Sequence, residues 1–106
     1  MVAVTGNALS VREISSEIPT EYFLTQNYPN PFNPSTEIRF GLKQNGHVLL
    51  TVYNIMGQEV ARLVDAPMNM GTHAVTFNAS DLASGIYYYS ITVNDFTRMQ
   101  KMALIR

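Results

Sequence analysis

The stretch GIYYYSITVNDFTRMQKMALI, residues 85–105, decides the fold class. In its first half, every second residue is apolar or aromatic: Tyr87, Tyr89, Ile91 and Val93. In a β-strand this alternation puts all four on one face. Asn94-Asp95 is a two-residue turn signal, and a further run follows over residues 96–105. The stretch therefore predicts two antiparallel strands joined by a tight hairpin. The pattern leaves open which side chains of residues 96–105 point inward.

Upstream, short alternating runs predict five more strands, over residues 22–25, 37–42, 48–52, 60–64 and 73–77. Clusters of Gly, Pro, Asn and Asp separate them, and no window shows a sustained helical period. We therefore predict an all-β protein, a seven-stranded antiparallel Ig-like β-sandwich spanning residues 21–106. Its expected core comprises Ile38, Phe40, Leu50, Val52, Val75, Phe77, Tyr87, Tyr89 and Ile91.

Local turn chemistry adds four expectations. Gln44-Asn45-Gly46 is expected to form a hairpin turn with a positive φ at Gly46, and residues 54–57 a second one with Gly57 in the left-handed region. The odd spacing of apolar residues over 60–64 predicts a β-bulge. Tyr87 is either the tyrosine of an Ig-like tyrosine corner or an ordinary core residue.

The most distinctive segment is NYPNPFNPST, residues 27–36. Its three prolines fix φ, remove backbone donors and bias the preceding residues to extended conformations, so the segment cannot lie centrally in a sheet. We expect a stiff crossover in which Tyr28 and Phe32 plug the ends of the sandwich.

Residues 1–20 have the composition of a linker or tail. We hypothesise that a piece of residues 2–14 adds to a sheet edge, because exposed edges recruit strands. The edge could belong to the same chain, or to a second copy in a homodimer formed by strand addition. The N-terminal residues contain no secretory signal, so a protein acting outside the cell would be a downstream piece of something longer.

Composition and motifs exclude most catalytic chemistry. The 106 residues carry a net charge of −1 and no cysteine, which rules out disulfides, thiolate metal sites and an electrostatic preference for nucleic acid. Nucleophile-elbow, phosphate-loop, dinucleotide and zinc-protease motifs are missing from the sequence. His47 and His73 are expected at the rim of the sandwich. We therefore expect no enzyme, no catalytic residue, no cofactor, no metal and no nucleic-acid partner.

The proline segment is also where the chain resembles a known family, the C-terminal sorting domain of cargo proteins of the type IX (Por) secretion system. The resemblance covers about residues 21–106 and rests on five pieces in the family's order: residues 26–36, 52–60, 71–77, 82–87 and 101–106. Small departures are Asn78, where an Asp is common, and Asn94-Asp95, which lacks the usual Gly.

The resemblance implies an Ig-like domain that directs an attached cargo across the outer membrane to the cell surface or medium of a Bacteroidetes-type bacterium. Its implied partners are the translocon, which reads the domain, and a surface transpeptidase, which usually removes it; the cargo itself lies outside this chain. The signature residues would be Pro29, Asn30, Pro31, Phe32, Gly85 and Tyr87. The partner-recognition residues would be Lys101, Met102, Leu104 and Arg106.

Two other classes share the expected fold. One is an extracellular Ig-like accessory module that binds sugar or self-associates, and the other is a flagellar hook-cap-like Ig domain. A sugar-binding module needs an exposed aromatic platform. The exposure of Tyr53, Tyr88 and Phe96 is therefore expected to distinguish a sugar-binding accessory module from a sorting domain.

Overall fold

A computed structural model describes residues 8–15 and 17–105 of the chain. These residues form eight strands and no helix. The strands are β1 (Ala8–Ser15), β2 (Phe23–Leu24), β3 (Ser35–Leu42), β4 (Gly46–Tyr53), β5 (Glu59–Met68), β6 (Gly71–Asn78), β7 (Gly85–Val93) and β8 (Phe96–Leu104). The all-β prediction is confirmed, but the count of seven was wrong, because the tail supplies an additional strand, β1.

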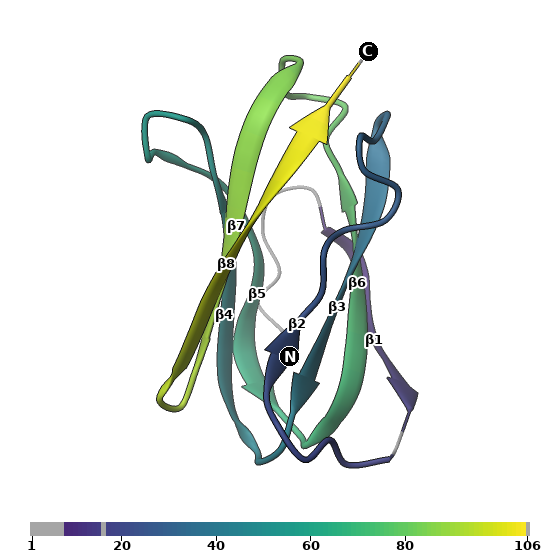
Figure 1. Cartoon of the computed structure of the whole chain (residues 1–106), viewed down its shortest axis with the longest axis vertical. Coiled ribbons are helices and arrows are strands. Elements are labelled where there is room, and N and C mark those ends of the chain that lie inside the picture. Colours follow the sequence, from purple (N-terminus) through teal and green to yellow (C-terminus); the bar gives the residue numbers. More distant parts are fainter. Residues whose placement is uncertain (1–7, 16, 106) are drawn as a thin grey trace.

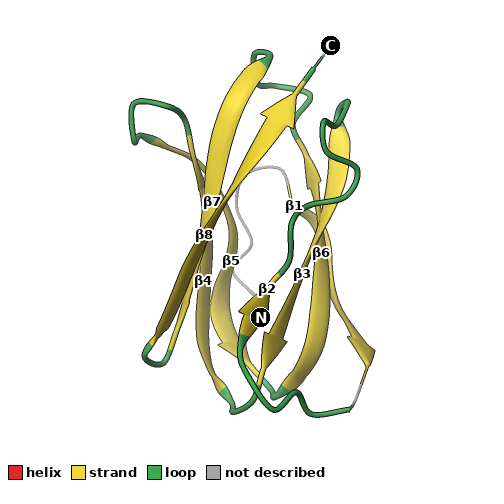
Figure 2. Cartoon of the chain, in the orientation of Figure 1, coloured by secondary structure: helices red, strands yellow, loops and turns green. Residues whose placement is uncertain are grey.

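The strands form two antiparallel sheets of four, in the orders β1-β6-β3-β2 and β5-β4-β7-β8. Figure 1 shows the two sheets as facing layers, and Figure 2 shows that only loops connect them. Strand β1 pairs with β6 of its own chain, with Val11 opposite Val75, and forms the edge of the first sheet. The tail therefore completes a sheet within the same chain.

The core lies between the two sheets and matches the alternation in the sequence. All nine residues predicted for it are buried, the most exposed being Tyr87 at 8%. The first sheet contributes Ile38, Phe40 and Phe77, and the second contributes Leu50 and Tyr89 among others. Because side chains alternate between the faces of a strand, each sheet presents one apolar face, and stacking the two faces removes both from water.

The predicted turns follow from local chemistry in most places. Gly57 has φ 81° and Asn94 has φ 53°, as hairpins of this kind require. A bulge also lies where it was expected. Thr51 pairs with Arg62 but Leu50 pairs with Val64, so the register shift brings Leu63 and Val64 into the core together.

The prediction for Gly46 was wrong. The turn over residues 43–45 joins β3 to β4, which belong to different sheets, so it is a crossover instead of a hairpin. Gly46 does not have a positive φ. It is small for a different reason: a Cβ there would lie 2.7 Å from the side-chain oxygen of Asn94.

Candidate recognition surface on the last strand

Strand β8 presents two different faces, and the β7–β8 hairpin fixes which is which. Val93 points into the core and pairs with Phe96 across the turn. The even positions of β8 therefore face the other sheet. Met102 and Leu104 are each only 1% exposed there, whereas Arg98, nearer the hairpin, is exposed. Lys101 lies at an odd position, and its side chain is exposed on the outer face of the second sheet.

The proline segment, residues 27–36, reaches the free edge of β8. The Phe32 amide donates to the Ala103 carbonyl at 2.9 Å, and the Ile105 amide donates to the Phe32 carbonyl at 3.0 Å. The Ala103 amide donates to the side-chain oxygen of Asn30, also at 3.0 Å. These bonds satisfy backbone N–H and C=O groups at the edge of β8 that its pairing with β7 leaves free. The segment therefore caps the end of the strand.

Polar side chains extend this contact along β2 and the residues after it. The side-chain amide of Gln26 donates to the Lys101 carbonyl at 2.6 Å, and the side-chain amide of Gln100 donates to the Leu24 carbonyl at 3.0 Å. The Tyr89 hydroxyl donates to the Thr25 carbonyl at 2.6 Å, and burial raises the pKa of this tyrosine far above its usual value. The two sheets are thereby fastened together at the β2–β8 side.

The two aromatic residues of the proline segment have opposite environments. Phe32 is 1% exposed, and its ring centroid lies 6.1 Å from that of Phe77, so it plugs the sandwich as predicted. The same prediction for Tyr28 was wrong, because its side chain is 81% exposed. Tyr28 instead uses its backbone, exchanging two hydrogen bonds with Glu37 of β3, which directs its ring away from the core.

Asn27 holds the bend of the proline segment from inside. Its side chain is nearly fully buried and donates to the Pro29 carbonyl and to the Thr36 hydroxyl, both at 3.0 Å. The Thr36 hydroxyl donates to the same carbonyl at 2.8 Å. Because the prolines cannot donate, these side chains supply the missing donors.

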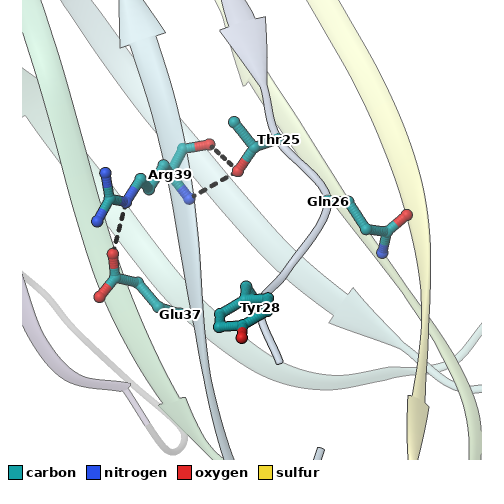
Figure 3. Close-up of a pocket in the computed structure, with 5 residues that line it drawn as sticks. All are labelled: Thr25, Gln26, Tyr28, Glu37 and Arg39. Atoms are coloured by element: carbon teal, nitrogen blue, oxygen red, sulfur yellow. Dashed lines mark hydrogen bonds and ion pairs between the residues drawn. The ribbon is translucent and has the colours of Figure 1, made fainter. Parts of the chain in front are cut away.

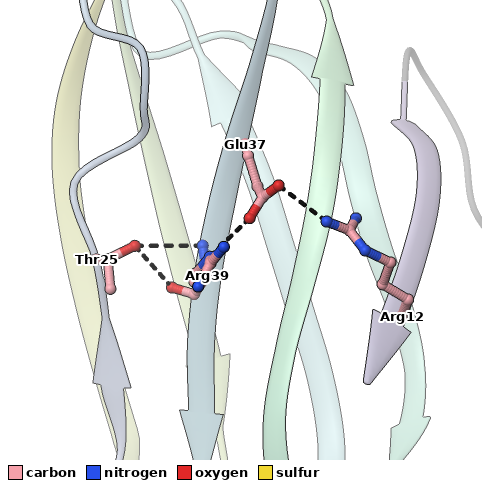
Figure 4. Close-up of polar contacts among 4 residues, drawn as sticks. All are labelled: Arg12, Thr25, Glu37 and Arg39. Carbon is pink, nitrogen blue, oxygen red and sulfur yellow. Dashed lines mark hydrogen bonds and ion pairs between the residues drawn. The ribbon is translucent and has the colours of Figure 1, made fainter. Parts of the chain in front are cut away.

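Beside Tyr28, a pocket of about 340 Å³ opens on the first sheet (Figure 3). Its lining comprises Thr25, Gln26, Tyr28, Glu37 and Arg39. An ion-pair network borders it, in which Glu37 lies 2.6 Å from Arg39 and 2.9 Å from Arg12 of β1 (Figure 4). Hydrogen bonds from Arg39, and then from Arg12, lower the pKa of Glu37 below its usual value.

The outer face of the second sheet carries a row of aromatic and basic residues. Tyr88 of β7 pairs with Tyr53 of β4 on one side and with Lys101 of β8 on the other. Ile86 and Ala103 pair one step further toward the end of the sheet. We call these five residues the outer-face row. It presents one positive charge beside half-buried aromatic rings.

Comparison with known families gives a match to the secretion system C-terminal sorting domain, over residues 26–105. The chain belongs to this family. Searches of curated proteins and of solved structures return no match. Membership supports a sorting role in type IX secretion, which implies interaction with the secretion machinery and a destination at the cell surface or beyond it. The family is not one of enzymes.

The structure brings the residues expected to form the family's signature to two places. Asn30 and Phe32 bond Ala103 at the end of β8, whereas the carbonyl of Pro29 accepts bonds from Asn27 and from Thr36 of β3. Gly85 begins β7, and the Tyr87 hydroxyl donates to the Ala83 carbonyl at 2.7 Å. Of the two alternatives for Tyr87, the tyrosine-corner geometry is therefore the one observed.

The four residues expected to contact a partner are not equivalent. Lys101 is exposed, whereas Met102 and Leu104 are part of the core and cannot touch a partner while the sandwich is closed. Arg106 lies outside the described residues. Sequence reasoning missed the inward direction of Met102 and Leu104, although a signal existed. A two-residue turn at Asn94-Asp95 places Val93 and Phe96 on the same face and so fixes the parity of the whole strand.

Other expectations about polar residues have mixed outcomes. His47 is exposed and bonds Asp65, as a rim residue would, but His73 is 4% exposed and its ring is stacked on Phe40. Its Nε2 lies 2.8 Å from the Asn69 carbonyl, which satisfies the buried ring. Residues 8–15 and 17–105 contain no cluster of His, Asp or Glu that could hold a metal ion. Within the same ranges, no helix has the length and apolarity to cross a membrane.

The aromatic residues chosen to separate the alternative functions are Tyr53, Tyr88 and Phe96, and all three are half-buried. Phe96 is further covered by Tyr22, whose ring stacks on it at 5.3 Å between centroids. These residues do not form an open platform. The exposed aromatic ring is that of Tyr28, on the opposite sheet.

Proposed function

We propose that this sorting domain is an address that the outer-membrane translocon of the type IX system reads on the folded sandwich. A surface transpeptidase then usually removes the domain from its cargo. The observation that carries the proposal is the family match over residues 26–105. The tyrosine corner and the two packed sheets further support an Ig-like topology.

The outer-face row is the part of the domain that we assign to reading. Lys101 is its only charged member and lies on the last strand, where Gln26 and, from the proline segment, Asn30 hold the backbone in place. A positive charge on a fixed strand favours an acidic partner surface, because complementary charge speeds encounter and suppresses wrong partners. Met102 and Leu104 act indirectly, by anchoring the strand that carries Lys101.

The test is export of a neutral periplasmic reporter fused before residues 1–106 in a host with a type IX system. Residues 1–20 are kept in the fusion because β1 is part of the first sheet. We expect the parent fusion to reach the surface or medium, and deletion of residues 97–106 to leave it in the periplasm. Normal export of the truncated fusion would refute the address.

One observation favours a second function, a sugar-binding accessory module. Tyr28 is 81% exposed beside the pocket that Glu37 and Arg39 border, and an exposed ring next to polar groups suits a sugar. Tyr28→Ala separates the two functions, because we expect it to leave export unchanged. Loss of binding to a glycan array with unchanged export would add this second activity to the domain.

A further inference from the structure

The turn between β4 and β5 exposes two large apolar side chains in succession. Ile55 is 73% exposed and Met56 is 78% exposed, more than any other large apolar side chain in the described ranges except that of Tyr28. Surface apolar residues are usually scattered singly. A pair at the tip of a hairpin is therefore a feature that folding of the domain does not explain.

The turn that carries these side chains is tightly organised. The Asn54 side-chain oxygen accepts bonds from the Met56 amide at 2.9 Å and from the Gln58 amide at 3.0 Å. The Asn54 side-chain amide donates to the Gln58 side chain, and two backbone bonds close the loop between Asn54, Gly57 and Gln58. Gly57, with φ 81°, permits the tight return. The loop thus fixes the backbone that carries Ile55 and Met56 before any partner binds, which lowers the entropic cost of binding.

The tip also lies next to the outer-face row. Tyr53 pairs with Tyr88, so Ile55 follows Tyr53 toward the same end of the sheet at which Ile86 precedes Tyr88. Ile105, which is 53% exposed, follows the last strand at this end. Figure 1 shows the β4–β5 turn and the last residues of β8 at the same end of the sandwich. The apolar tip thus continues a surface that already has a proposed role.

We infer that Ile55 and Met56 form an apolar anchor that inserts into an apolar pocket of the protein in the secretion machinery that reads Lys101. This inference rests on the proposed function and extends the reading surface to a second loop. A protein pocket is favoured over a lipid surface because residues 44–61 contain no Lys or Arg and do contain the exposed Glu59, whose carboxylate an anionic surface repels. The single Lys101 of the adjoining row is far short of the roughly four to eight basic residues that clusters binding anionic membranes contain. Loops that bind anionic membranes combine apolar residues with basic ones.

The experiment compares export of the reporter fusion for four chains: the parent, the double variant Ile55→Ser/Met56→Ser, the apolar variant Ile55→Leu/Met56→Leu, and Met70→Ser. Met70 is the matched control, because it is 39% exposed and lies in the β5–β6 turn, outside the proposed surface. Urea denaturation of each purified chain verifies that the sandwich remains folded, which we expect because exposed turn side chains contribute little to stability.

We expect at least tenfold less exported reporter for the double serine variant, because buried anchor residues dominate binding energy. The leucine variant and Met70→Ser should be exported like the parent. Normal export of the serine variant, or loss of export in the leucine variant, overturns the apolar anchor. If the parent itself stays in the periplasm, the proposed address has failed and not the anchor alone.

A second measurement addresses the lipid alternative. Purified chain is sedimented with vesicles of phosphatidylethanolamine and phosphatidylglycerol, and we expect it to remain in the supernatant. Co-sedimentation that the serine substitutions abolish would overturn the protein pocket and assign the tip to the membrane surface.

Discussion

Removing the ring of Phe32 tests whether the proline segment fastens the last strand to the sandwich. The side chain is 1% exposed and packs 6.1 Å from Phe77, measured between ring centroids. Truncating a fully buried Phe to Ala typically costs about 3–5 kcal/mol, from lost transfer free energy and from the cavity that remains. Because a domain of this kind is stable by only about 5–15 kcal/mol, Phe32→Ala should remove a large share of the total.

Urea denaturation followed by circular dichroism measures this loss. With a slope of about 1.5 kcal/mol/M, the midpoint should fall by about 2–3 M. The Ile105 amide, which donates to the Phe32 carbonyl, should exchange its proton faster in the variant. Tyr28→Ala is the control in the same segment, and its exposed side chain should cost less than about 0.5 kcal/mol. A loss below about 1 kcal/mol for Phe32→Ala would refute the idea that this ring is a structural plug.

Three other substitutions have defined outcomes. Lys101→Glu should reduce export of the fused reporter while changing the free energy of unfolding by less than about 0.5 kcal/mol, and unfolding as severe as that of Phe32→Ala would mean that Lys101 is structural. Tyr87→Phe deletes the bond to the Ala83 carbonyl and should cost about 1 kcal/mol by urea denaturation. Glu37→Gln should cost at most about 1 kcal/mol at pH 7, since its ion pairs are partly exposed. Because the folded state lowers the pKa of Glu37, its contribution is present above the pKa of the unfolded chain and is lost as the pH falls through the folded value, so this deficit should vanish in acid denaturation profiles.

The sequence predicts the parts of this fold that depend on local chemistry. Gly57 and Asn94 adopt positive φ because the hairpins that contain them require it, and those turns are recognisable from a few residues. The alternation of Ile38 and Phe40 predicts a buried face in the same way, because side chains alternate along any strand. The division of the chain at residue 21 into linker and sorting domain stays a prediction.

The features that the sequence did not predict depend on partners distant in the chain. Gly46 is adjacent to Asn94, a neighbour that no local pattern contains. Tyr28 is exposed because its backbone pairs with Glu37, which sets the direction of the side chain. The contact of Asn30 with Ala103 joins two motifs that the sequence presents as separate. Each of these features depends on a contact between residues far apart in the chain, and the local sequence pattern does not specify such contacts.

The bond between Asn30 and Ala103 closes a loop of 73 positions and has a consequence for biosynthesis. Contacts so distant in sequence form late, because loop closure costs entropy before the contact can repay it. Residues 101–105 leave the ribosome long after residues 30–32, so the proline segment has no strand to hold until they emerge. An interrupted translation product would therefore lack a closed sandwich. The sandwich therefore closes only after synthesis has passed this strand, and the proposed recognition of the folded domain would pass over chains interrupted before it.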